Sequence, residues 1–150
     1  MGEGTAMSGE DTLRTTFSLN DGGASIAEAR HAAVHFLTRV NTAHRLGVSQ
    51  RVVDLLQLVV SELVTNSRKY APGPARMDLR IDGEEIEVAV WDSAPALPVA
   101  KAPDAARIGQ HGLEIVKAVT RSVHVQRTEP VGKRVIARLA LQDEPSRTRV

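Results

Sequence analysis

The sequence predicts an α+β fold, a two-layer α/β sandwich in which helices cover one face of a mixed, mostly antiparallel sheet. Apolar residues recur at helical spacing in two long consecutive stretches, and they alternate at every second position in five short stretches. The resulting order is β-α-α-β-β-loop-α-β-β. Because strands follow strands and helices follow helices, this order favours an antiparallel or mixed sheet with its helices on one face.

The first half of the chain is expected to contain one strand and two helices. Alternating apolar residues predict the strand at 12–19. Helical spacing predicts a first helix that begins at a capping Ser25 and ends near Gly47, a residue type common after helix ends. A second helix is expected from Ser49 to Tyr70, because prolines follow directly.

The second half is expected to begin with a hairpin. Alternating stretches at 77–81 and 86–92 flank Asp82-Gly83, a typical hairpin turn. A long loop then spans 93–108, and a short helix is expected at 109–121. Two final strands, beginning near Val123 and Val135, are separated by a turn that contains Gly132.

Length and composition indicate one soluble globular domain. We expect it to span residues 11–142 of the 150, between a disordered N-terminal tail at 1–10 and a polar C-terminal tail at 143–150. The formal charge of +1 argues against direct nucleic-acid binding through a basic face. The absence of Cys excludes disulfides, thiolate metal sites and Cys nucleophiles. Without a membrane-length apolar run or a signal peptide, the expected location is the cytoplasm.

The helix at 49–70 carries two polar residues on its apolar side. At about 100° per residue, Glu62 and Asn66 fall within the apolar stripe. A carboxylate and an amide that face a core are costly unless something satisfies them, so a pocket for a metal ion or polar substrate is one interpretation. The alternative is that both bond to nearby backbone, or that Glu62 sits at the edge of the stripe. The stripe itself consists of Val52, Leu55, Val59 and Leu63.

These residue types suit phosphate chemistry. An Asn carbonyl oxygen is a ligand that a divalent cation accepts. A carboxylate one turn away, as at Glu62, can orient an attacking water or hydroxyl. Lys69, roughly one further turn along, could reach a phosphate as a point charge.

Two further features could complete such a site. Asp92 shares the apolar face of its strand and can accept a hydrogen bond from an exocyclic amine such as that of adenine; the alternative is a turn-forming Asp. Gly109 and Gly112 precede a helix, where exposed N–H groups attract anions; the alternative is a simple turn. His111 between them reads, by itself, as a polar loop residue.

Taken together, these features resemble the GHKL (histidine kinase-like) ATPase superfamily. The segment Glu62–Ala71, ELVTNSRKYA, is similar to the family's N-box, E-L-x-x-N-A-x-K-H/Y-A. Asp92 matches the Asp of the D-x-G-x-G box, and Gly112–Val116 matches the end of the second glycine box. The similarity covers about residues 12–141, and the small size most resembles bacterial anti-sigma factor serine/threonine kinases.

The resemblance implies a Bergerat-type ATP-binding fold that uses ATP and Mg²⁺. It implies that Glu62 is the general base and that Asn66 holds the Mg²⁺. It also implies a protein partner, either a STAS-type anti-anti-sigma protein or a sigma factor, and it allows a homodimer. The residues implied to contact the nucleotide are Asn66, Lys69, Asp92, Ala94, Gly109, His111, Gly112 and Leu113.

The glycine boxes depart from the family pattern. Ala94 and Ala96 replace both glycines of the first box, and Gln110 stands where the second box has a glycine. A Cβ at Ala94 and the stiff ring of Pro95 would hinder a close approach of the backbone to the base. Three functions therefore stay open: a kinase that regulates its partner, a partner-binding module with weak or lost nucleotide turnover, and a metabolic ATPase or detached histidine-kinase domain.

Overall fold

The computed structural model describes residues 13–19, 26–70, 75–92, 112–128 and 132–142. The predicted order of strands and helices is confirmed across these ranges. The expected domain limits of 11 and 142 stay a prediction. The elements are β1 (Arg14–Leu19), α3 (Ile26–His44), α4 (Gln50–Tyr70), β2 (Ala75–Asp82), β3 (Glu85–Asp92), a helix at 112–119, β4 (Ser122–Arg127) and β5 (Lys133–Ala140).

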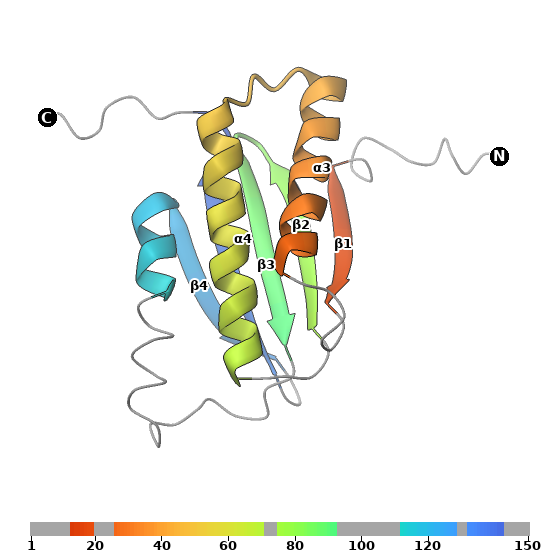
Figure 1. Cartoon of the computed structure of the whole chain (residues 1–150). Helices are drawn as coiled ribbons and strands as arrows, with labels where there is room; N and C mark the ends of the chain where they lie inside the picture. Colours follow the sequence, from red (N-terminus) through yellow and green to blue (C-terminus); the bar gives the residue numbers. More distant parts are fainter. Residues whose placement is uncertain (1–12, 20–25, 71–74, 93–111, 129–131, 143–150) are drawn as a thin grey trace, which may run out of the picture.

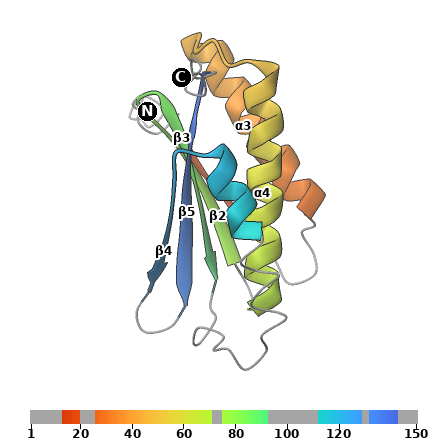
Figure 2. The same ribbon diagram turned by 90° about the vertical axis from the view of Figure 1, so that its left-hand side faces the viewer.

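The five strands form one sheet in the order β1-β2-β3-β5-β4. Every pairing between neighbouring strands is antiparallel, so the described strands contain no parallel pair. The helices form a second layer on one face of this sheet (Figures 1 and 2). The α+β sandwich is therefore confirmed. Within the described ranges, no helix has the length and apolar character needed to cross a membrane.

The β2–β3 hairpin turns where the sequence predicts it. Asp82 pairs with Glu85, which leaves Gly83 and Glu84 as the loop. Gly83 has a φ of 66°. Glycine adopts this left-handed conformation without the steric penalty of other residues. The short turn fixes the register that places Val88 and Val90 on the helix-covered face.

A capping serine begins α4, and left-handed residues follow the end of α3. The Ser49 hydroxyl accepts a hydrogen bond from the Val52 N–H at 3.3 Å, which confirms Ser49 as the cap of α4. Helix α3 ends at His44, slightly before the expected end, and the left-handed residues Arg45 (φ 50°) and Gly47 (φ 72°) follow. A helix cannot continue through such residues, so they turn the chain back toward α4.

The core lies between the sheet and the helix pair. One correction concerns the buried stripe of α4: Leu56 is fully buried, whereas Leu55 is only half-buried. The stripe is therefore rotated away from the Glu62 side of the helix. The largest fully buried side chains are Phe36, Leu37, Leu56, Leu63, Met77, Leu79 and Ile86.

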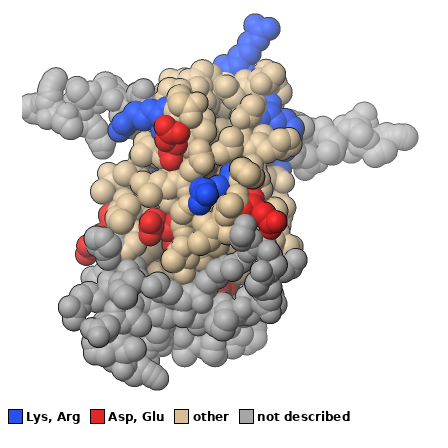
Figure 3. Space-filling model, viewed as in Figure 1, with Lys and Arg blue, Asp and Glu red and all other residues tan. Residues whose placement is uncertain are grey.

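The other face of the sheet carries charged and aromatic side chains. The Trp91 ring lies between two guanidinium groups, 4.5 Å from Arg76 and 4.7 Å from Arg134. Its indole N–H donates to Asp78 at 2.7 Å. Cation–π contacts and this hydrogen bond cover the open face without a second helix layer. On the helix side, charged residues are scattered among uncharged ones over the part of the chain that is described (Figure 3).

Candidate functional site

Helix α4 and strand β3 bring three predicted site residues to one end of the molecule. Both elements have their C-terminal ends there (Figure 1). Asn66 is buried, with 7% of its surface exposed, while Glu62 is half-buried. The expectation that both residues fall within the apolar stripe thus holds for Asn66, whereas Glu62 lies at the edge of the stripe. A partly exposed carboxylate beside a buried amide can still interact with a ligand from solvent.

Gly112 lies directly against Glu62. A Cβ added at Gly112 would lie 2.9 Å from Glu62 Oε1, closer than side chains normally approach. Gly112 is the first described residue of the helix at 112–119, which lies beside α4 (Figure 2). The structure therefore brings Glu62 and Gly112, which are far apart in the sequence, together. Any larger residue at position 112 would displace the Glu62 carboxylate, which is the movable end of a flexible side chain.

Asp92 occupies the helix-covered face, as the alternation predicts. It lies two residues after Val90 on the strand whose alternate residues Val88 and Val90 belong to the hydrophobic core, and its side chain is 1% exposed. Its Oδ2 atom accepts a hydrogen bond from Lys133 Nζ at 2.9 Å, and the two residues face each other across β3 and β5. Sequence reasoning missed Lys133. The signal was present, because Lys133 has the same alternation as Val135 and so faces the helices.

Several of the predicted nucleotide contacts lie outside the described residues. These are Ala94, Gly109 and His111. Lys69 belongs to α4, but its side chain also lies outside the described part. Leu113 is described, and it is half-buried and packs against the hydrophobic core. That packing holds the helix at 112–119 against the core next to Gly112.

Glu62 and Asn66 offer few oxygen ligands, which suits a cation that is held mainly by waters and substrate phosphates. Among the described residues there is no group of three or more His, Cys, Asp or Glu side chains that could form a complete metal cage. Mg²⁺ commonly binds through only one or two protein oxygens, together with waters and substrate phosphates. Asn66, with one amide oxygen, and Glu62 one turn away are compatible with this kind of binding.

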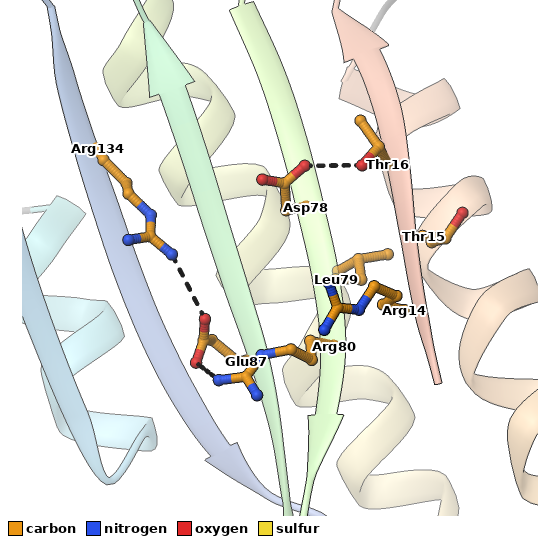
Figure 4. Close-up of a pocket in the computed structure, with 8 residues that line it drawn as sticks. All are labelled: Arg14, Thr15, Thr16, Asp78, Leu79, Arg80, Glu87 and Arg134. Carbon is orange, nitrogen blue, oxygen red and sulfur yellow. Dashed lines mark hydrogen bonds and ion pairs between the residues drawn. The ribbon is translucent and has the colours of Figure 1, made fainter. Parts of the chain in front are cut away.

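A separate hollow of about 370 Å³ lies on the open face of the sheet (Figure 4). Glu87 lies in its wall and accepts a hydrogen bond from Arg80 at 2.7 Å. This bond raises the pKa of Arg80 above its usual value. Arg138 and Arg134 also pair with Glu87, at 3.1 and 3.7 Å. Three guanidinium groups thus share one carboxylate, and the hollow is best described as a surface salt-bridge network.

Comparison with known families agrees with this geometry. A family model for the histidine kinase-like ATPase domain matches residues 24–139, which include Glu62, Asn66 and Asp92. Among curated proteins, no similar sequence was found. The match spans both long helices, the helix at 112–119 and four of the five strands. The chain therefore belongs to the histidine kinase-like ATPase domain family.

Proposed function

We propose that this chain is an ATP- and Mg²⁺-dependent serine/threonine protein kinase that phosphorylates or sequesters a partner regulator. The partner would be a STAS-type anti-anti-sigma protein or a sigma factor, by resemblance to the small anti-sigma kinases. The observation that carries the proposal is the contact of Glu62 with Gly112. Glu62 lies one helical turn from the buried Asn66. By the resemblance, Glu62 would act in catalysis and the Gly112 region would close over the phosphates.

Each residue has a distinct role in this proposal. Asn66 would hold Mg²⁺, which neutralises charge on the phosphates during transfer. Glu62 would accept the proton of the partner's Ser or Thr hydroxyl. That oxygen then forms a bond to the γ-phosphorus while the bond to the bridging β–γ oxygen breaks, and ADP leaves. A half-buried carboxylate suits this role because it reaches both the site and the incoming partner.

A second candidate function rests on a different observation. Asp92, expected to accept from the adenine amino group, already accepts a hydrogen bond from Lys133. A base would have to share this carboxylate with the Lys133 ammonium group, and nucleotide binding is weak if it does not. A partner-binding module with weak or absent turnover on the same fold is therefore the alternative.

The test uses two variants that remove different interactions. Glu62→Gln keeps the size of the side chain but removes the base, so phosphate transfer should fall by about 10²–10⁴-fold. Its affinity for Mg-ATP should change little. Asn66→Ala removes the side-chain oxygen proposed to bind Mg²⁺, so both the affinity for Mg-ATP and the rate of phosphate transfer should fall. Lys117→Ala, on the exposed side of the helix at 112–119, is the matched control and should behave as the parent.

Labelled phosphate transfer from ATP to a STAS-type protein is measured beside partner capture and calorimetry with Mg-ATP. Transfer by the parent, with the two variants separated as described, supports the kinase. If the parent captures its partner but transfers no phosphate, the binding module is correct. If Glu62→Gln transfers phosphate as fast as the parent, the assignment of the base is wrong.

A further inference from the structure

Asp92 and Lys133 form a buried ion pair at the site end of the sheet. Lys133 Nζ lies 2.9 Å from Asp92 Oδ2, and the side chains are only 7% and 1% exposed, respectively. Asp92 is the last residue of β3, and Lys133 is the first residue of β5, directly opposite. The pair therefore lies at one end of the neighbouring strands β3 and β5, at the place where the base of a nucleotide is expected.

A purely structural role explains this pair poorly. Burying two charges removes them from water, and well-packed apolar residues often give equal or greater stability. The preceding inward-facing positions of β3 are all apolar, and so are the following inward-facing positions of β5. Charge thus appears on this face only where the strands reach the site. The apolar inward-facing positions are Ile86, Val88 and Val90 on β3 and Val135, Ala137 and Leu139 on β5.

The pair offers an acceptor and a donor side by side. A carboxylate only accepts hydrogen bonds, and an ammonium group only donates them, with up to three bonds in different directions. Lys133 can therefore keep its bond to Asp92 and donate to a ligand at the same time. Its flexible four-carbon stem lets the ammonium group adjust to either side of the carboxylate.

Purine bases have matching edges. Adenine presents an amino donor next to a ring-nitrogen acceptor. Guanine and hypoxanthine present the reverse, a keto oxygen next to a ring N–H donor. A carboxylate alone would repel the keto oxygen, whereas the ammonium group of Lys133 can bond to it while Asp92 accepts from the ring N–H.

We propose that Lys133 is a second base-reading residue and that this site accepts keto purine nucleotides as well as adenine nucleotides. This inference rests on the proposed nucleotide binding of the chain. It changes the expected specificity, because one residue converts an acceptor-only site into a site with both an acceptor and a donor. Substrate choice would then extend to GTP and ITP.

The first experiment needs no variant. Calorimetry of the full chain with Mg²⁺ compares ATP, GTP, ITP and CTP. GTP and ITP should bind within about tenfold of ATP, because each of the three bases would form a matched pair of hydrogen bonds with Asp92 and Lys133. A base edge that lost this match would bind roughly tenfold weaker or more. If ATP binds and GTP and ITP are more than about 100-fold weaker, Lys133 does not read the base, although the proposed function survives. If no nucleotide binds, both proposals fail.

The second experiment removes the donor. Lys133→Met keeps most of the stem but removes the ammonium group, so GTP and ITP affinity should fall at least about tenfold more than ATP affinity. Lys133→Arg retains donors and should preserve GTP binding better. Lys117→Met, on an exposed position, is the matched control. An equal loss for all purines in Lys133→Met, with folding intact by circular dichroism, would overturn the base-reading role.

Discussion

Substituting Gly112 tests whether the position of the Glu62 carboxylate matters for chemistry. In Gly112→Ala, the new Cβ would lie 2.9 Å from Glu62 Oε1, and an ordinary contact begins at 3.4 Å. The Glu62 carboxylate must therefore move by roughly half an ångström. It can do so because it is the end of a flexible side chain. A misplacement of about 1 Å at a reacting group costs about 10²-fold in rate, so we expect phosphate transfer to fall by about tenfold.

Stability should change little in the same variant. Gly112 does not have a positive φ, so alanine fits its backbone. Replacing glycine by alanine at such a position typically raises the free energy of unfolding by about 0.4–1 kcal/mol, because it restricts the unfolded chain. Moving Glu62 from its rotamer costs about 0.5–1.5 kcal/mol. The two effects nearly cancel, and the free energy of unfolding should stay within about 1 kcal/mol of the parent.

The assay pairs labelled phosphate transfer with urea unfolding monitored by circular dichroism. Lys117→Ala, in the same helix but exposed, controls for general effects of substitution there. A tenfold slower transfer with unchanged stability supports the positioning of Glu62. Unchanged transfer would refute the reasoning. A loss of more than about 3 kcal/mol would also refute it, because the contact would then be rigid core packing rather than a movable carboxylate.

Three further substitutions test the rest of the structure. Asp92→Asn leaves the buried Lys133 ammonium without its carboxylate, so equilibrium unfolding should show a loss of about 3–5 kcal/mol; a loss below about 1 kcal/mol would contradict the buried pair. Leu56→Ala should cost about 2–5 kcal/mol in urea, since Leu56 is fully buried, and a smaller cost than Leu55→Ala would show that the stripe is misassigned. Trp91→Ala removes two cation–π contacts and the hydrogen bond to Asp78; thermal unfolding should show a loss of about 1–3 kcal/mol, and no change would mean that the open face contributes nothing.

The sequence alone determined the elements, because helical and alternating periodicity are local properties of the chain. It placed Asn66 on the buried side of α4 and Asp92 on the helix-covered face of β3, and both positions are confirmed. The Ser49 cap and the Gly83 turn were also predictable, since each depends only on neighbouring residues. The position of the stripe was predicted less well. Leu55 and Leu56 differ by one residue, and only packing against the sheet decides which is buried.

Only the tertiary structure decided which distant residues meet. The contact of Gly112 with Glu62 joins two helices, and the pair of Lys133 with Asp92 joins two strands. The cluster of guanidinium groups around Glu87 joins residues of β2 and β5 in the same way. Periodicity tells which face a side chain occupies, but it carries no information about its partner on another element. Strand order and register supply that information, and here they turned an expected lone acceptor at Asp92 into a paired one.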